Sequence, residues 1–384
     1  MKWLLVAAMV FLGTACGTSL RPAAPTRQAT TAPSAGLVYV RGEAGGPIEV
    51  VDARAGRLAR MLPAGVPAPD WRSLYRLSAG ELQVLDAATG VLVATHAAPA
   101  WARDVATSAN GRWLVLIDPD GSRFQVQDAG FTSPPASVSL GGRFTFDGVS
   151  GDGRRLYLLQ WVSPGRYQVR MYDVVRGALS PQVISDKQEV GQLMSGQALA
   201  SLPTGDGAMQ LTLYQRRADG RAFVHVLPVS TDMGIAFCVD LPGPGAGWGF
   251  VAGPTGDVFY AVNPGAGLVV QLSTFGRVGP PSVRDGAVDR QPAIGDAPAA
   301  AVSPDGTTLY LALAHGLAAL DTHTLKVRTQ ALGDPLEALG TAPDGSALYA
   351  IAGQGRLERI DPRTLSVVGT VALDRPAGAI LRVD

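Results

Sequence analysis

The chain has 384 residues, with 47 glycines and 28 prolines, and its 32 Lys and Arg residues are balanced by 32 Asp and Glu residues. A chain with no net charge offers no basic surface to neutralise phosphates, which argues against nucleic-acid binding. The length exceeds that of most single domains, but a repeat fold grows by adding units rather than by enlarging one core. The high glycine content indicates a chain that turns often.

The N-terminus has the pattern of an exported protein. Lys2 precedes an apolar stretch of about ten residues, which suits a signal peptide and is too short to span a bilayer. The segment Leu12-Gly-Thr-Ala-Cys16 then resembles the bacterial lipobox, which implies that residues 1–15 are removed and that Cys16 is lipidated. Gly13 stands where that motif usually has Leu, so ordinary cleavage near Ala15 and release is the alternative.

The segment after Cys16 predicts a tether. Residues 16–36 are rich in Thr, Ser, Pro and Ala, with Leu20 as the single large apolar residue, so they cannot bury a core. The protein is therefore expected to be exported and held on the outer side of the cytoplasmic membrane or in the cell envelope, contacting membrane only through its lipid. The other cysteine, Cys238, is expected to be a buried small apolar residue.

Two turn patterns alternate through residues 37–384. The first is Ser303-Pro-Asp-Gly306, which recurs about 40 residues later as Ala342-Pro-Asp-Gly345, and Asp-Gly suits the positive φ angles of a tight hairpin. The second is an apolar strand that closes in Asp, as in Asp321-Thr-His-Thr324. These Asp side chains are predicted to accept hydrogen bonds from turn amides, not to act in catalysis.

Four short strands in a period of about 40 residues predict an all-β fold, a β-propeller spanning residues 37–384. Eight units of about 43 residues fit a usual blade better than seven of about 50, with seven as the alternative. The first unit, Leu37–Leu62, lacks its first strand, and Ala379–Asp384 is a strand without a hairpin partner. The C-terminal strand is therefore predicted to complete the first blade and close the ring.

The paired turn pattern resembles the YVTN-type, WD40-like propeller repeats of bacterial proteins. Residues 299–373 match it best, and residues 104–128 and 147–179 match in part. The stretch Leu82-Gln-Val-Leu-Asp86 also resembles quinoprotein-type repeats, but the Trp that ends their last strand is replaced here by Ala94 or Thr95. The resemblance thus implies a fold and no quinone cofactor, and it leaves the function open because the matching residues are turns and strands.

Catalytic and metal-binding patterns are not found in the sequence. The four histidines fall in different units without metal-ligand spacing, and no Gly-x-Ser-x-Gly elbow or phosphate-binding loop occurs. No catalytic residue, metal ligand or cofactor is therefore predicted. Propeller lactonases are the alternative, because propeller active sites draw single residues from several blades, but their site residues cannot be matched to this chain.

The candidate binding residues follow from the geometry of a propeller. One face, the turn face, carries the uniform turns after the first and third strands of each blade. The opposite face, the variable face, carries the irregular links, of which the connector Arg277–Pro298 is long enough to be a binding loop or a passive insertion. Residues that open the innermost strands are expected to ring the channel mouth on this face, although the tryptophans among them could instead pack between blades. The predicted binding residues are Trp71, Arg72, Trp101, Arg103, Asp104, Phe144, Trp248, Arg284, Asp285, Arg290 and Glu337.

The leading functional hypothesis is therefore a monomeric envelope lipoprotein whose propeller binds or scaffolds a protein or cell-wall partner without catalysis. The alternative is a lactonase-like or other hydrolytic enzyme with its site at the mouth of the channel.

Overall fold

The computed structural model describes residues 36–42, 46–186, 193–216, 220–232, 234–274, 279–287, 299–353 and 355–384. These residues belong to one compact unit, Ala35–Asp384. All of their regular structure is β, and within these ranges there is no helix that could cross a membrane. The predicted signal peptide, Cys16 and most of the tether lie outside the described residues.

The strands in chain order are β1 (Leu37–Gly42), β2 (Ile48–Asp52), β3 (Arg57–Leu62), β4 (Val66–Pro67), β5 (Ser73–Ser78), β6 (Glu81–Asp86), β7 (Leu92–Ala97), β8 (Asp104–Thr107), β9 (Trp113–Ile117), β10 (Arg123–Asp128), β11 (Ala136–Ser139), β12 (Phe144–Val149), β13 (Arg155–Ser163), β14 (Arg166–Asp173), β15 (Ala178–Asp186), β16 (Met194–Ser195), β17 (Gln197–Pro203), β18 (Met209–Gln215), β19 (Ala222–Pro228), β20 (Ile235–Asp240), β21 (Gly249–Ala252), β22 (Val258–Asn263), β23 (Leu268–Ser273), β24 (Ser282–Ala287), β25 (Ala300–Val302), β26 (Thr308–Leu313), β27 (Gly316–Asp321), β28 (Val327–Ala331), β29 (Leu336–Thr341), β30 (Leu348–Ala352), β31 (Arg356–Ile360), β32 (Val367–Ala372) and β33 (Ala377–Val383).

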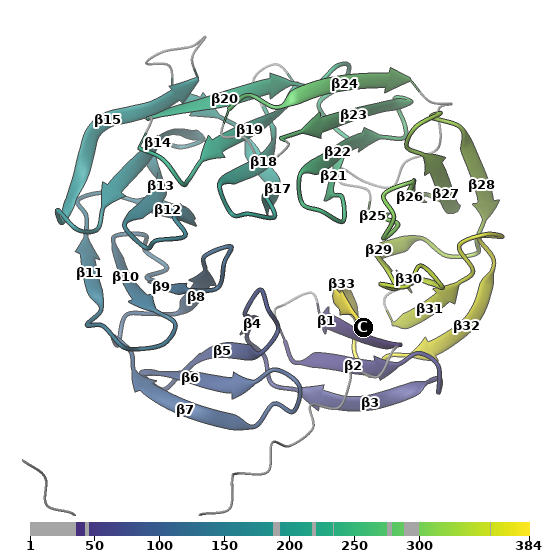
Figure 1. The fold of residues 1–384 in the computed structure, drawn as a ribbon, viewed down its shortest axis with the longest axis horizontal. Helices are drawn as coiled ribbons and strands as arrows, with labels where there is room; N and C mark the ends of the chain where they lie inside the picture. The colour runs from purple at the N-terminus through teal and green to yellow at the C-terminus, as the bar shows by residue number, and fades with distance from the viewer. Residues whose placement is uncertain are drawn as a thin grey trace, which may run out of the picture. The chain divides into compact units, whose positions relative to one another are not determined.

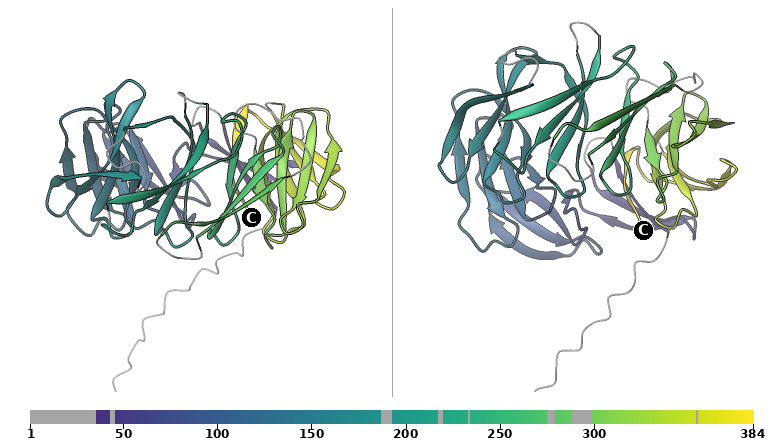
Figure 2. Two further views of the ribbon diagram at one scale, coloured as in Figure 1. Left: turned by 90° about the horizontal axis from the view of Figure 1, so that it is seen from above. Right: turned by 45° about the horizontal axis from the view of Figure 1, so that its top comes forward.

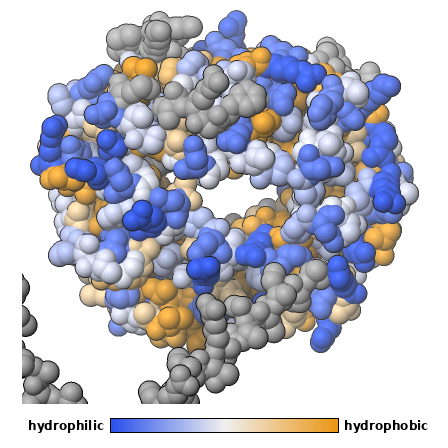
Figure 3. Space-filling view, viewed as in Figure 1, coloured by the Kyte–Doolittle hydropathy of each residue, from blue (hydrophilic) through white to orange (hydrophobic). Residues whose placement is uncertain are grey.

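These strands form a β-propeller, as predicted. Six sheets are four-stranded, with the orders β3-β2-β1-β33, β4-β5-β6-β7, β8-β9-β10-β11, β21-β22-β23-β24, β25-β26-β27-β28 and β29-β30-β31-β32. Figure 1 shows the sheets arranged radially around a central opening, with one edge strand of each at the opening and the other at the rim. The left view of Figure 2 shows the ring from its side, and Figure 3 shows that side chains leave the central channel open.

The remaining sheet is larger. It runs β12-β13-β14-β15-β20-β19-β18-β17, and β16 pairs with β14. Its two antiparallel halves are joined by a short parallel pairing in which Ser185 lies opposite Ile235. Each half has the strand order of a blade, and counting them separately would give the eight units expected from the sequence. Because the two halves are hydrogen-bonded into one sheet, the number of blades stays a prediction.

The ring is closed by the two ends of the folded chain, as the sequence predicted. β33 pairs antiparallel with β1, so that Val38 lies opposite Val383 and Tyr39 opposite Arg382. The amide of Gly36 donates to the carbonyl oxygen of Asp384 at 2.6 Å, and the amide of Asp384 donates to Leu37. This pairing satisfies the inner edge of β1, which would otherwise expose unpaired backbone groups.

The repeated Asp residues have the structural role expected of them. Asp305 Oδ1 accepts hydrogen bonds from Ser303 Oγ at 2.6 Å and from the amide of Thr307 at 3.0 Å. Asp321 Oδ1 likewise accepts hydrogen bonds from the amides of His323 and Thr324. These bonds lower the pKa of both carboxyl groups. Asp305 and Asp321 are therefore engaged within their own turns.

Two predicted boundaries are wrong. Trp71 does not open an innermost strand, because β4 is innermost in that sheet and Trp71 lies in the β4–β5 turn with φ 55°. Ala68-Pro-Asp-Trp71 makes this turn with Trp where the other turns have Gly, so a search for Asp-Gly overlooks it. The connector Arg277–Pro298 is not wholly irregular, since its residues 282–287 form β24, which pairs with β23 along its whole length.

Candidate functional site

A pocket lined by residues of three consecutive sheets, near their inner strands, is the main candidate site. It has a volume of about 240 Å³ and is lined by Arg41 on β1, Arg76 on β5, and Arg103 with Asp104 at the start of β8, together with Ala64, Gly65, Val66, Tyr75, Leu77 and Val105. Figure 1 shows β4 and β8 beside the central opening, and β1 next to β33, the innermost strand of its sheet. The links that open β4 and β8 place this channel-mouth pocket on the variable face.

The three guanidinium groups are held by neutral oxygen atoms. Arg41 Nη2 donates to the carbonyl oxygen of Gly65 at 3.3 Å. Arg76 donates to Gln83 Oε1 through Nη2 at 2.6 Å and through Nε at 3.0 Å. Arg103 Nη1 donates to the carbonyl oxygens of Ala100 and Ala102 at 2.6 and 2.8 Å. The side chains are thus oriented by hydrogen bonds that leave their positive charge in place.

Arg103 and Asp104 lie where the sequence placed them, at the variable-face end of an innermost strand. Arg103 is exposed and also lines a neighbouring pocket of about 450 Å³ that extends along Leu77–Gly80, Ala98–Ala100 and Ala102. Sequence reasoning missed Arg41 and Arg76, which lie inside strands away from any motif. The available signal was an arginine within an otherwise apolar strand segment, as in Leu74-Tyr-Arg-Leu77.

Trp101 lies beside this site in a packing role. It is partly buried against the apolar cluster between the β4–β7 and β8–β11 sheets. The guanidinium of Arg123 lies 5.4 Å from the Trp101 ring centroid, and Arg123 Nε is 2.6 Å from the buried Asp118 Oδ2. Trp101 therefore joins two blades, which is the alternative that the sequence left open for the tryptophans.

Trp248 and Phe144 do not lie at the channel mouth. Trp248 has no exposed surface, packs in the core beside Leu213 and Phe259, and donates from Nε1 to the carbonyl oxygen of Pro244 at 2.7 Å. Phe144 is only 3% exposed and packs in the core of the β8–β11 and β12–β15 region. Both side chains are too buried for contact with a partner. Their large aromatic rings instead stabilise the core.

Arg72 and Glu337 both lie outside the channel-mouth pocket. Arg72 is exposed on the turn face, where its Nε lies 3.7 Å from Asp70 Oδ2. Glu337 is the second residue of the innermost strand β29, at a break in register opposite β30. Its Oε2 is buried without a hydrogen bond among the described residues. Neither residue contributes to the channel-mouth pocket.

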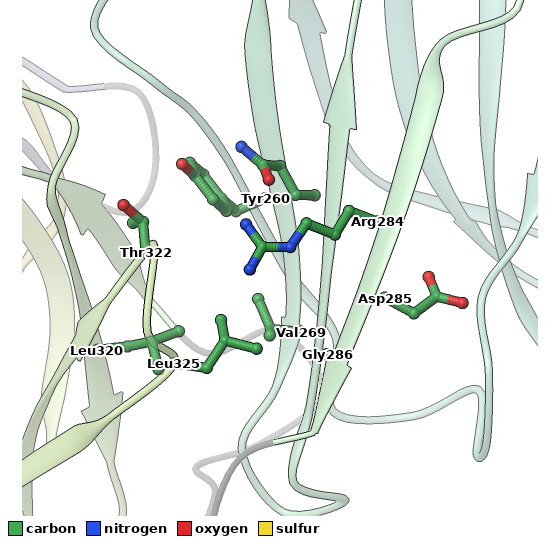
Figure 4. A pocket seen from close by; sticks show the side chains of 9 residues that line it. Tyr260, Val269, Arg284, Asp285, Gly286, Leu320, Thr322 and Leu325 are labelled. Atoms are coloured by element: carbon green, nitrogen blue, oxygen red, sulfur yellow. The ribbon is translucent and has the colours of Figure 1, made fainter.

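Arg284 and Asp285 lie on β24, the outer strand of its sheet, and Arg290 lies outside the described residues. Arg284 Nη2 donates to the carbonyl oxygen of His323 at 3.1 Å, which connects this sheet to the next one. Figure 4 shows Arg284 directed toward Thr322 and Tyr260, whereas Asp285 points to the other side of the strand. The crevice beneath Arg284 holds only about 10 Å³, space for one water molecule. Arg284 therefore links two blades across a packed contact.

A second group of polar residues was missed by the sequence analysis. Asp147 is the extra residue of a β-bulge in the innermost strand β12, between Phe146 and Gly148. Burial raises the pKa of Asp147 to about 7. Burial and the charge of Asp147 also raise the pKa of the Tyr214 hydroxyl. The ring centroids of Tyr214 and Tyr167 are 6.0 Å apart. The Tyr167 hydroxyl is buried and makes no hydrogen bond among the described residues. Bulges often occur beside functional sites, and this one depends on tertiary burial that a linear scan cannot see.

The described residues contain no group of three or more His, Cys, Asp or Glu side chains placed to hold a metal ion. Fold and site together therefore define a β-propeller protein with an arginine-lined pocket at its channel mouth. No protein-family model and no curated protein matches the chain. Among solved structures, β-propeller proteins are similar to it.

The dihydro-heme d1 dehydrogenase NirN in complex with DHE is similar over 93% of this chain and 77% of its own, with 16% sequence identity and a TM-score of 0.59. The apo form of AztD from Citrobacter koseri covers 79% of this chain and 82% of its own, at 15% identity and a TM-score of 0.48. At such identities the likeness to NirN supports the fold alone.

Proposed function

We propose that this protein is an exported lipoprotein, anchored through Cys16, whose propeller is a binding or scaffold module of the cell envelope. The variable face presents the binding surface to a protein or cell-wall partner, and the protein acts as a monomer. The propeller fold supports a binding role in general. The particular location is supported by the channel-mouth pocket, where Arg41, Arg76 and Arg103 converge from three sheets.

The oriented arginines of the channel-mouth pocket carry this proposal. On the turn face, the carboxylates of Asp305 and Asp321 accept hydrogen bonds from adjacent backbone amides. At the channel mouth, Arg103 is exposed and lines a pocket. A partner that docks on the variable face therefore meets charged groups that are oriented and accessible. Exposed arginines of this kind are frequent at binding hot spots.

A pull-down from envelope extracts with the full-length, detergent-solubilised protein tests this proposal. The variable-face variant carries Arg103→Glu and Arg143→Glu, and the matched turn-face variant carries Arg112→Glu and Arg154→Glu. All four arginines are exposed, so each pair should fold like the wild type. The variable-face variant should lose partners that the turn-face variant retains. Equal recovery from both variants would contradict a binding surface on the variable face.

A second candidate function is a lactonase-like or other hydrolytic activity in the channel. The observation that favours it is Asp147, whose carboxyl group lies in a bulge of an innermost strand and has its pKa raised by burial to about 7. A carboxylate with such a pKa is suited to act as a general base near neutral pH. Hydrolysis of a panel of lactones and esters by the wild type, abolished by Asp147→Asn, would support this activity. A wild type without hydrolysis of any member would remove it.

A further inference from the structure

The three arginines of the channel-mouth pocket retain unused hydrogen-bond donors. A guanidinium group carries five N–H donors in a planar fork. Arg41 uses one of them on Gly65, and Arg76 uses two on Gln83. Arg103 uses two on Ala100 and Ala102. Each guanidinium therefore keeps at least three donors for a ligand, and its orientation is already set by the bonds that it makes.

The positive charge of the pocket is not neutralised by the described residues. Asp104 is the carboxylate that lines the pocket, and its Oδ1 accepts a hydrogen bond from the amide of Val105 at 2.8 Å. Among the described residues, no ion pair within 4.0 Å links Asp104 or another carboxylate to Arg41, Arg76 or Arg103. Within the described part of the chain, three cations and one anion therefore line the pocket.

The partial burial of Arg41 favours a bound anion. Arg41 is partly buried, and this desolvation lowers the pKa of its guanidinium. A cation that is removed from water is stabilised by a negative partner, and an arginine fork pairs well with the two oxygens of a carboxylate or phosphate.

The size of the pocket indicates what fits. Pockets for whole small-molecule ligands usually measure about 300–1,000 Å³. At about 240 Å³, the channel-mouth pocket is smaller, so it suits one charged group of a larger ligand. We propose that this pocket binds an oxyanion, a carboxylate or phosphate group carried by the molecule that docks on the variable face. This inference rests on the proposed function and adds to it the chemical class of the ligand.

Calorimetric titration of the full-length protein with small anions tests the proposal. Inorganic phosphate, succinate and chloride are compared at pH 7 and constant ionic strength, because surface electrostatics alone would respond to ionic strength. We expect saturable binding of phosphate or succinate and none of chloride. Arg103→Gln should weaken that binding about tenfold or more, since each bidentate contact involves a charged donor. Arg112→Gln, an exposed substitution on the turn face, should leave it unchanged.

Each outcome decides a separate point. Tighter binding of phosphate than of succinate assigns a phosphate group, and the reverse order assigns a carboxylate. No saturable binding of either anion, or an equal loss in Arg103→Gln and Arg112→Gln, overturns the proposal. Arg103 is exposed, so Arg103→Gln should keep the wild-type melting temperature. Arg41 is partly buried, and Arg103→Gln still tests the pocket if a substitution of Arg41 unfolds the protein. If the pull-down still separates the two faces while no anion binds, the binding module stands and only the oxyanion is lost.

Discussion

The indole ring of Trp71 lies 4.9 Å from the phenol ring of Tyr39, measured between centroids, at an interplanar angle of 58°. The guanidinium of Arg382 lies 5.4 Å from the Trp71 centroid and 6.0 Å from that of Tyr39. Tyr39 and Arg382 are opposite each other in the pairing that closes the ring, and Trp71 belongs to the next sheet. This three-residue cluster therefore fastens the closing seam to its neighbouring blade.

Substitutions of Trp71 should separate two contributions to the free energy of unfolding, the strain of its positive φ and the stabilisation by its indole ring. A non-glycine residue at φ 55° costs about 1–2 kcal/mol, whereas an aromatic pair contributes about 0.5–1.5 kcal/mol beyond the area that it buries. Trp71→Ala keeps the backbone cost and loses the ring, and Trp71→Gly loses both. Urea denaturation should rank the wild type as most stable, Trp71→Gly next and Trp71→Ala last. An alanine variant more stable than the glycine variant would contradict this account of the turn.

Deletion of Ala379–Asp384 should open the ring. The deletion removes most of β33, exposes the inner edge of β1 and uncovers apolar residues such as Val38 and Val40. Loss of a paired inner strand should lower the free energy of unfolding by several kcal/mol. A fall in melting temperature and faster proteolysis near β1 would be the readout. The point variant Arg382→Ala serves as a control, because it removes one side chain but keeps the strand, and its effect should be much smaller.

The stability of the protein should depend on the ionisation of Asp147. Its pKa is about 7 in the folded protein and about 3.9 in an unfolded chain, so the folded state holds the proton more tightly. The free energy of unfolding should therefore fall as the pH rises from about 4 to about 7 and then level off, by at most about 4 kcal/mol. Asp147→Asn should remove this slope, so at pH 8 the variant should be more stable relative to the wild type than it is at pH 5.

Melting curves across that pH range provide the measurement for Asp147. Asp285→Asn, an exposed substitution on the outer strand β24, is the matched control and should keep the wild-type slope. A wild type whose melting temperature does not fall between pH 5 and pH 8 would show that Asp147 is solvated in solution.

Trp248→Ala should act on folding rather than on binding. Its side chain has no exposed surface and lies among Leu213 and Phe259, so truncation leaves a large cavity and should cost about 3–5 kcal/mol. Trp101→Ala, at a partly buried site, should cost less. Chemical denaturation of both variants is the measurement, and equal stabilities would be inconsistent with the burial of Trp248. If Trp248→Ala lost a partner in a pull-down, the cause would therefore be unfolding and not the removal of a contact with that partner.

Membrane attachment is predicted to depend on Cys16. If Cys16 carries the lipid, Cys16→Ala should move the protein from the membrane fraction to the soluble fraction and abolish acyl labelling. Unchanged fractionation and labelling would contradict the lipobox interpretation. Cys238→Ala is the matched control, because it removes the other cysteine and should leave attachment unchanged.

Turns and strand periodicity made the fold predictable from the sequence. Asp305 and Gly306 show why, because a short side chain that caps its own turn and a residue that accepts positive φ act locally, independent of distant parts of the chain. The closing strand could be inferred because one unit lacked a strand and one strand lacked a unit. The position of Trp71 was predicted wrongly because the turn Ala68-Pro-Asp-Trp71 has Trp where the Asp-Gly pattern requires Gly.

The candidate site could be predicted only in part. Arg103 and Asp104 were found because they directly precede and begin an innermost strand, a position that the repeat pattern reveals. Arg41 and Arg76 join them only through the packing of three sheets. In the sequence Arg41 lies 62 residues and Arg76 lies 27 residues before Arg103, and the three arginines share no pattern.

By itself, then, the sequence determined the all-β propeller, its closure and the structural role of the turn aspartates, because these follow from local backbone preferences repeated along the chain. Only the tertiary structure decided which side chains are buried and which meet. It placed Trp248 in the core, moved Trp71 to the closing seam, and raised the pKa of Asp147 through burial. Burial and convergence depend on how separate blades pack, and no single repeat carries that information.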